Sequence, residues 1–472
     1  MKRLTGFKRA WLSKALAPPE DGQPEALKRF LAKAVSGTFG FKILNVGLMY
    51  ANSLLMVKLA GASGYGDYAY IIAWSQILLI PAALGFEGLI SRELAVFFDQ
   101  HRWPQAKGML KFSNALVLIN SVLLAAIAIA GFWLLGLAAG PQSLMAFAIG
   151  LASLPFLALS RLRTASLQAI KSIIASQLPE AIIRPGILFL GLGGLLVWQG
   201  LRGQAALLSS PALMSMNWVA TAIAFWVGSW LLKRSLSVKL QATSTQHSIQ
   251  HSIQHSIQHS IQYSRRQWLK AAMPMLLIGS MYVINGQTDA VMLGSLKDSA
   301  TVGIYTVANR GAGLISFVQI AFATSLAPVF ATLFAQGKLD ELKKTIKRSC
   351  QATFLLSLAV AVLLMLCSHW FLRVFGPEFL AGQTALFVLM GSQLVNAFTG
   401  ATAQLLIMTG YDRDTAIGVS ISAAVNVVLN AVMIPPYGLN GAAIATATST
   451  VLWNVILVGF TYKRFKVIST AI

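Results

Sequence analysis

Long apolar segments follow one another through most of this sequence, and they constrain its fold more than any other feature. A segment such as LLSLAVAVLLMLC is apolar on every side, whereas the strands of a barrel alternate apolar and polar residues. A helix of about 20 apolar residues crosses the hydrocarbon core of a bilayer, which is about 30 Å thick. The sequence therefore predicts twelve helical spans, at 35–57, 68–90, 112–136, 142–160, 180–200, 210–232, 271–293, 303–331, 350–371, 383–408, 414–434 and 440–461.

The composition argues against a soluble catalytic protein. Hydrophobic residues make up 56% of the chain and charged residues 11%, against about 25% charged residues in an average soluble domain. The sequence contains no GxxxxGK[ST] nucleotide loop, no zinc constellation and no nucleophile elbow. We therefore expect a transporter with no catalytic residues, no resident metal and no cofactor, for which a proton or sodium gradient is the candidate energy source.

Lysine and arginine residues predict the orientation of the chain. The net charge is +22, and 30 of the 37 Lys and Arg residues lie in the two tails and in alternate loops, all on one side of the expected spans. The opposite loops carry only Lys58, Arg202, Lys297 and Arg373. This is the positive-inside pattern, and it predicts an inner (plasma) membrane protein of bacterial type with both termini in the cytoplasm. Its expected surface partner is anionic lipid, not nucleic acid.

The longest expected connection follows the sixth span. Residues 233–268 contain His-Ser-Ile-Gln four times, at 247–262. Histidines four residues apart could share a helical face and bind a metal, but an unvaried short repeat is typical of a low-complexity linker, the reading that we favour. The expected organisation is a basic cytoplasmic tail (1–33), a first lobe (34–232), this linker (233–268), a second lobe (269–462) and a cytoplasmic tail (463–472).

The two halves of the chain also resemble each other. The expected outer loop LAGASGYGDYAYI and its counterpart LGSLKDSATVGIYTVA both place Gly-x-Tyr where the chain re-enters the membrane, with Gly66 and Tyr68 in one and Gly303 and Tyr305 in the other. An even number of spans per half gives both halves the same orientation. The predicted fold class is an all-α polytopic membrane protein. Its twelve transmembrane helices would form two six-helix lobes related by a pseudo-two-fold axis along the membrane normal.

Six segments between about residue 30 and residue 465 carry a resemblance to a known family through their order and spacing. They are MVKLAGASGYGDYAYIIAWSQ (56–76), AALGFEGLISRELA (82–95), LGSLKDSATVGIYTVANR (293–310), SLAPVFATLFAQGKLDELKK (325–344), VFGPEF (374–379) and NVVLNAVMIPPYGLNGAAIATATS (426–449). With them the chain resembles the oligosaccharidyl-lipid (O-antigen-type) flippases. These flippases form the polysaccharide-transporter branch of the MATE-like multidrug/oligosaccharidyl-lipid/polysaccharide (MOP) superfamily.

The resemblance implies a function and a set of partners. The expected activity is translocation of a polyprenyl-diphosphate-linked oligosaccharide from the cytoplasmic to the outer leaflet, by alternating access, for surface polysaccharide biosynthesis. Polysaccharide-assembly proteins are the expected protein partners. The histidine tract and the basic N-terminal tail depart from the family pattern, and no function is assigned to either.

Cations inside the spans are the candidate substrate-binding residues, because a diphosphate that crosses hydrocarbon needs positive groups in a water-filled cavity. They are Lys42, Arg310 and Arg184. Each has an alternative reading. Lys42 could snorkel to the head groups, and Arg310 could form an ion pair with Asp289. Arg184 lies four residues after Glu180 and could pair with it at the interface, which we favour for this residue.

Asp289 is the candidate ion-coupling group, with Asn285 and Gln287 beside it. An embedded carboxylate next to amides could bind a proton or a sodium ion and couple it to the movement of the lobes. The alternative is a structural ion pair or an interface residue. Asn426 and Asn430 are expected to join helices by hydrogen bonds.

Two other functions stay open. A multidrug/cation antiporter of the same superfamily would favour embedded carboxylates, whereas embedded Lys and Arg predominate here. A membrane-embedded polysaccharide polymerase or ligase would need a sizeable outer loop for its catalytic groups, and the expected outer loops are short. The flippase is therefore the favoured function.

Overall fold

The computed structural model describes residues 24–100, 102–136, 140–203, 207–247, 265–467 and 469–471, and every regular element among them is a helix. The first part of the chain holds α2 (Pro24–Ala83), α3 (Phe86–Asp99), α4 (Trp103–Leu134), α5 (Pro141–Leu151), α6 (Leu154–Ala169), α7 (Ile173–Leu178), the π-helical turn η1 (Pro179–Ile183), α8 (Arg184–Arg202) and α9 (Ser210–His247). The second part holds α10 (Arg265–Leu296), α11 (Ser299–Ala335), α12 (Leu339–Phe375), the 3₁₀ turn η2 (Pro377–Gly382), α13 (Gln383–Thr399), α14 (Thr402–Met408) and α15 (Asp412–Phe465).

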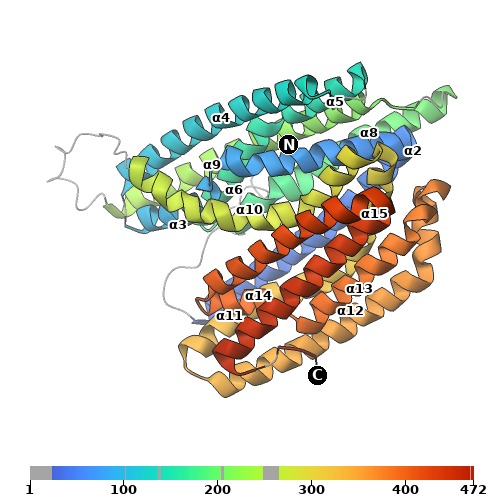
Figure 1. Cartoon of the computed structure of the whole chain (residues 1–472). Helices are drawn as coiled ribbons and strands as arrows, with labels where there is room; N and C mark the ends of the chain where they lie inside the picture. Colours follow the sequence, from blue (N-terminus) through green and yellow to red (C-terminus); the bar gives the residue numbers. More distant parts are fainter. Residues whose placement is uncertain are drawn as a thin grey trace.

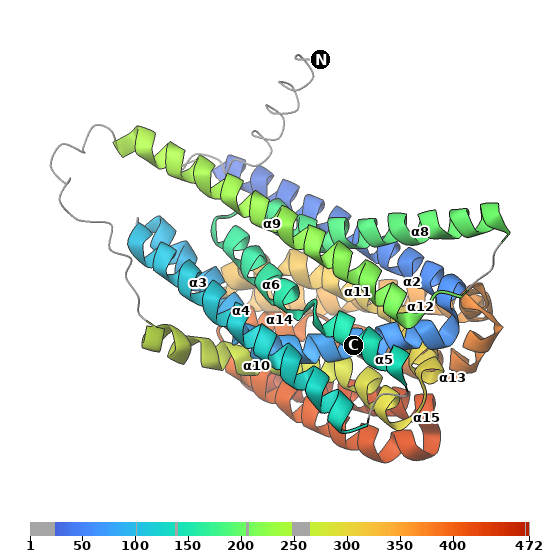
Figure 2. The same cartoon turned by 90° about the horizontal axis from the view of Figure 1, so that it is seen from above.

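The helices gather into two groups (Figures 1 and 2). In one group α4, α5, α6 and α9 pack against one another, and in the other α11, α12, α13 and α15 do so. Two helices join the groups: α2 packs along α11, and α10 contacts α2 and α3 as well as α15. An apolar cluster that includes Met56, Leu213 and Leu386 draws on both groups. The interface between the two groups therefore contains a buried apolar core.

Much of the outward-facing surface is apolar. Leu123, Ile127 and Leu366 are 55%, 65% and 76% exposed, which is unfavourable in water and suits contact with lipid chains. Within the described part of the chain, nine helical segments are long and apolar enough to cross a membrane. The prediction of an all-helical protein with several membrane spans is confirmed.

Two of these segments are long enough for two crossings each. Gly40–Ala83 has 44 residues and Asp412–Phe465 has 54, whereas about 20 suffice for one crossing. Each segment contains one glycine with a non-helical backbone, Gly61 (φ 72°, ψ −178°) in α2 and Gly438 (φ 54°, ψ −128°) in α15. These positive φ angles favour glycine, and they kink what is otherwise a continuous helix.

The structure interrupts three spans that the sequence predicts as unbroken. The span 68–90 breaks where Leu84 (φ 52°) and Gly85 (φ 72°) adopt left-handed conformations between α2 and α3. The span 142–160 breaks between α5 and α6, and the span 383–408 breaks at Gly400 (φ 67°). Runs of apolar residues indicate burial in lipid but contain no signal for a local reversal of the backbone, so the prediction was wrong at these points.

The expected linker is helical at both ends. Helix α9 continues to His247 and α10 begins at Arg265, so the first and last residues of 233–268 belong to helices. Nearly all of the His-Ser-Ile-Gln tract lies outside the described residues, as do residues 1–23 of the N-terminal tail. Both readings of the tract stay predictions.

Helices α2 and α11 cross closely at their two Gly-x-Tyr motifs. A Cβ atom added at Gly66 would overlap the backbone carbonyl of Ser299 and lie 3.0 Å from the nitrogen of Gly303, and a Cβ atom added at Gly303 would overlap the backbone of α2. Beside this contact, the Asp67 carboxylate accepts hydrogen bonds from Ser299 and, at 2.6 Å, from Ser210. The two glycines therefore permit the close approach, and Asp67 connects the first turns of α11 and α9.

Candidate substrate cavity and ion site

A polar cavity of about 180 Å³ lies between α2, the η1–α8 segment and α11. The α2 residues that line it recur every three or four positions, so they share one face of the helix. The lining brings together two arginines, one glutamate and several amide and hydroxyl groups. It comprises Asn45, Met49, Asn52, Ser53, Met56, Tyr68, Glu180, Arg184, Pro185, Leu188 and Arg310.

Two asparagines on α2 hold the opposite wall of the cavity, which is formed by the π-helical turn η1 and the start of α8. Pro185 has no N–H group to donate to the carbonyl four residues earlier, and the Nδ2 of Asn45 donates to that carbonyl, on Ala181, at 2.9 Å. The Nδ2 of Asn52 donates to the carbonyl of Pro185, also at 2.9 Å. The start of α8 is thus tied to α2 by side chains, and this holds Arg184 at the edge of the cavity.

Arg184 reaches the cavity with two polar partners in contact, Glu180 and Asn217. Its side chain is 16% exposed, and its Nη1 lies 3.4 Å from Oε2 of Glu180. Its Nη2 donates to Oδ1 of Asn217 at 3.1 Å, and Tyr68 donates to the same oxygen at 3.4 Å. The expected ion pair with Glu180 is present, and both partners line the cavity. The ion-pair and cavity readings of Arg184 are therefore compatible.

Arg310 enters the cavity from α11. Its Nη1 donates to Oγ of Ser53, and its guanidinium carbon lies 5.7 Å from the centre of the Tyr65 ring, within cation–π range. The backbone carbonyl of Arg310 accepts a hydrogen bond from the hydroxyl of Tyr50. None of the ion pairs in the described part of the chain includes Arg310. The alternative pairing with Asp289 is therefore not formed, and the charge faces the cavity without a carboxylate partner.

Lys42 does not belong to the lining of this cavity in the structure. It is half-buried on α2, one turn before Asn45 and on the same face of the helix as Asn45 and Met49. Its position extends the polar face beyond the cavity and leaves both readings of Lys42 as predictions.

Asp289 forms a second, separate polar site between α10, α11 and α15. The side chain is 3% exposed. Its Oδ1 accepts from Nδ2 of Asn430 at 2.7 Å and of Asn426 at 3.4 Å, and its Oδ2 accepts from the hydroxyl of Tyr305 at 2.6 Å and from Thr446. A buried carboxylate is costly unless its charge is paired or hydrogen-bonded. Here, amides and hydroxyls from α11 and α15 supply the hydrogen bonds.

The two residues predicted to assist Asp289, Asn285 and Gln287, lie on the same helix but are not hydrogen-bonded to it among the described residues. Oδ1 of Asn285 is buried without a partner in that part of the chain. Asn426 and Asn430, which the sequence predicts to join helices, do join α15 to α10 through this carboxylate. The amides of the site thus come from a distant helix and not from the neighbours of Asp289 in sequence.

Comparison with known proteins places the chain among transporters. Residues 274–432 match the family model described as MatE. The probable low-salt glycan biosynthesis flippase Agl15 of Haloferax volcanii is 24% identical over 444 residues, which cover 92% of this chain and 85% of that protein. The probable flippase AglR of the same organism is 30% identical over 174 residues, and the match spans about a third of each protein, 36% in both cases.

Solved structures share the fold. An inward-facing multidrug resistance MATE family transporter of the MOP superfamily aligns with a TM-score of 0.70 at 15% identity, over 89% of this chain and 94% of that one. The chain is thus similar to members of the MOP superfamily in fold and, more weakly, in sequence. The lipid II flippase MurJ in an inward closed conformation also aligns, with a TM-score of 0.58 at 14% identity, over 91% and 87% of the two chains. These similarities bear out the prediction of a transporter, not an enzyme.

Several residues that the sequence reasoning did not select belong to the two sites. Asn52 and Asn217 line or support the cavity, and Tyr305 and Thr446 bond to Asp289. For Tyr305, the repeated Gly-x-Tyr motif was a signal that could have been used. A single asparagine or threonine within an apolar helix gives no comparable indication.

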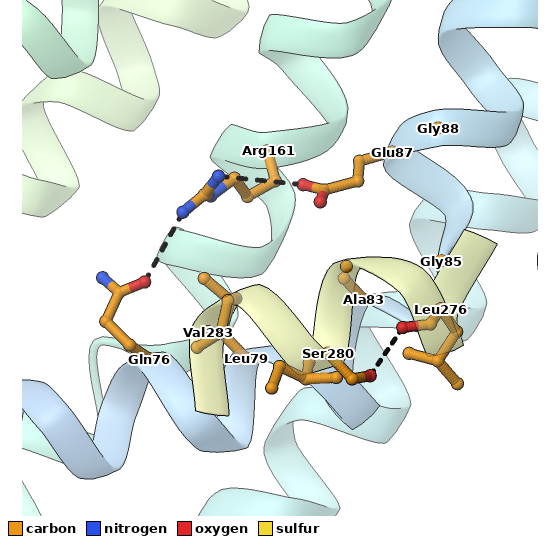
Figure 3. Close-up of a pocket in the computed structure, with 12 residues that line it drawn as sticks. Gln76, Leu79, Ala83, Gly85, Glu87, Gly88, Arg161, Leu276, Ser280 and Val283 are labelled. Atoms are coloured by element: carbon orange, nitrogen blue, oxygen red, sulfur yellow. Dashed lines mark hydrogen bonds and ion pairs between the residues drawn. The ribbon is translucent and has the colours of Figure 1, made fainter. Parts of the chain in front are cut away.

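A further cavity of about 130 Å³ lies between α2, α3, α6 and α10 (Figure 3). Arg161 extends between Glu87, at 3.9 Å, and Gln76, at 3.5 Å. Both charged side chains are about half exposed, at 50% and 47%, and their opposite charges compensate. This cavity therefore offers an anionic ligand much less than the cavity that holds Arg310.

Proposed function

We propose that this chain is a flippase for polyprenyl-diphosphate-linked oligosaccharide, and that the diphosphate binds between Arg184 and Arg310. The observation that carries the proposal is the meeting of these two arginines at one polar cavity. Guanidinium groups bind phosphate oxygens with paired hydrogen bonds, and Asn45 and Asn52 offer amides to sugar hydroxyls. The similarity to the two flippases named above supports the same substrate class.

The proposed transport cycle is alternating access between two lobes of six helices. Counting the kinked α2 and α15 as two crossings each, and each interrupted helix as one, gives the twelve spans that the sequence predicts. In the orientation expected from the Lys and Arg distribution, the crossing of Gly66 and Gly303 lies at the outer end. The cavity would then be closed toward the outside, and α2 and α11 must separate there for the substrate to leave.

Asp289 is proposed as the group that couples transport to a proton or sodium gradient. Its two oxygens already collect donors from Asn426, Asn430, Tyr305 and Thr446. Proton or cation binding would neutralise the carboxylate and change these hydrogen bonds together. Because the donors come from α11 and α15 while Asp289 lies on α10, such a change alters how the three helices are held.

The test of the proposed function is the fate of lipid-linked sugar in cells. Deleting the chain should cause lipid-linked oligosaccharide to accumulate on the cytoplasmic face, and Arg310→Ala should reproduce the defect. Loss of a hydrogen bond to a charged group costs about 1.5–3 kcal/mol, which is roughly a 10- to 150-fold loss of transport efficiency. The matched control is Arg202→Ala, whose guanidinium stacks on Trp198 at 4.4 Å, outside the cavity lining.

The same experiment separates the alternatives. Normal glycan export in the deletion strain would refute the flippase. A changed resistance to cationic drugs with intact surface glycan would identify an antiporter instead. Accumulation of translocated but unpolymerised units on the outer face would indicate a polymerase or ligase.

A further inference from the structure

Glu180 lies where two cavities share a wall. On one side it lines the polar cavity with Arg184, and on the other it lines a narrow, tightly packed space with Arg163, Ser160 and Thr164 of α6. It is carried by the π-helical turn η1, in which the N–H of Arg184 donates to the carbonyl five residues earlier. Such turns break the regular ladder of a helix and occur frequently at functional sites.

The carboxylate of Glu180 is incompletely paired. Oε2 lies 3.4 Å from Arg184, longer than the roughly 2.7–2.9 Å of a strong charge-assisted hydrogen bond. Oε1 is buried, and no hydrogen-bond partner for it occurs among the described residues. A buried carboxylate oxygen without a hydrogen bond is destabilising, so a hydrogen bond from any donor within reach would stabilise it.

Arg163 is a cation that lacks an anion. Its Nη1 donates to Oδ1 of Asn114 at 2.6 Å, its Nε donates to Ser229 at 3.2 Å, and its guanidinium lies 5.6 Å from the centre of the Phe225 ring. None of the ion pairs found in the described ranges includes it. Its contacts are therefore all with neutral groups, although the carboxylate of Glu180 borders the same narrow space.

We propose that Glu180 is a positioning residue that occupies Arg184 while the cavity is empty and moves to Arg163 when a diphosphate takes its place. This inference rests on the proposed function and deepens it. The single carboxylate satisfies one arginine at a time, so an incoming diphosphate must displace it from Arg184. Arg163 provides the displaced carboxylate with a partner on the far side of η1. Binding at Arg184 is thereby restricted to anions that compete well with a carboxylate, as a diphosphate does.

The test is a double-mutant cycle in binding of farnesyl diphosphate, a soluble polyprenyl diphosphate, to the purified full-length chain in nanodiscs. Glu180→Gln should tighten binding, because the amide cannot compete for Arg184. Arg163→Gln should weaken binding, because Glu180 then has no second partner. In the Glu180→Gln background, Arg163→Gln should have almost no further effect. We expect each single change to shift Kd by roughly tenfold, within the range of measured coupling between neighbouring groups.

Two controls separate the possible outcomes. Arg163→Lys keeps the charge and should bind almost as wild type. If Arg163→Gln fails to fold, the affinity of Glu180→Gln for farnesyl diphosphate tests the inference by itself. Unchanged or weaker binding in that variant overturns the inference. Equal effects of Arg163→Gln in both backgrounds would show a simple charge effect and would also overturn it. Absence of wild-type binding, or an Arg310→Ala variant that binds normally, would refute the proposed function itself.

Discussion

Replacing Gly66 with alanine should open the end of the molecule where α2 crosses α11. The added Cβ atom would overlap the carbonyl of Ser299 and approach the nitrogen of Gly303 to 3.0 Å. Both obstacles are backbone atoms, so no change of rotamer can relieve them. A Cβ atom essentially never lies within 3.0 Å of such an atom, and the helices must therefore move apart.

The expected cost follows from this geometry. Overpacking by one methyl group in a tight contact costs about 1–3 kcal/mol. This cost falls on the arrangement in which α2 and α11 touch and is absent once they separate. The ratio of open to closed molecules should therefore rise by roughly 5- to 150-fold, since about 1.4 kcal/mol corresponds to a factor of ten. Gly303→Ala should act in the same direction, because its Cβ atom would overlap the backbone of α2.

The assay is labelling of a cysteine in the cavity by a membrane-impermeant maleimide applied to the outer side. Met56→Cys is a suitable reporter, because Met56 lines the cavity and is 2% exposed. Cys350 and Cys367 are first replaced by serine. Gly66→Ala should raise the labelling rate by the factor above, and Gly47→Ala should not, because nothing lies within 4 Å of a Cβ atom added there. Equal labelling in both variants would refute the reasoning.

Three further predictions concern single side chains. Asp289→Asn should keep the fold but abolish the dependence of transport on an imposed proton or sodium gradient in vesicles; a variant that still follows the gradient would exclude Asp289 as the coupling group. Asn45→Ala removes the donor to the carbonyl of Ala181 and should lower the free energy of unfolding by about 1–2 kcal/mol, measured by thermal denaturation in detergent against Gly47→Ala. Asp298 caps α11 by accepting from the N–H of Thr301 at 2.9 Å, and this bond lowers the pKa of its carboxyl. Its contribution to stability should be present above the unfolded-state pKa and be lost as the pH falls through the folded-state pKa, and Asp298→Ala should remove this pH dependence.

The membrane class could be predicted from the sequence because lipid imposes a condition on every span independently of its neighbours. Segments such as Trp103–Leu134 must be apolar wherever they pack, so local composition reveals them. The charge bias of the loops has the same local character. The backbone reversals at Leu84 and Gly400 have no such signal, and there the prediction failed.

The partners of the site residues could not be predicted, because they are set by which helices meet. Arg310 donates to Ser53, 257 positions earlier, and Asn430 donates to Asp289, 141 positions earlier. One polar residue in an apolar run shows that a partner is needed but not which helix supplies it. The pair of Arg184 and Glu180 was predictable because its spacing of four residues lies within one stretch of helix.

Helix α11 connects the crossing, the cavity and the buried carboxylate within two turns. Gly303 and Arg310 are seven residues apart, so they share the face that meets α2 and lie about 10 Å apart along the axis. Tyr305 points to another face and donates to Asp289 at 2.6 Å. A rigid helical stretch cannot move at one of these points alone. Displacing α11 far enough to separate Gly303 from Gly66 must also change the contact of Arg310 with Ser53 and the hydrogen bond of Tyr305. The ion proposed to bind at Asp289 and the diphosphate proposed to bind at Arg310 would therefore bias the same movement without any direct contact between the two sites.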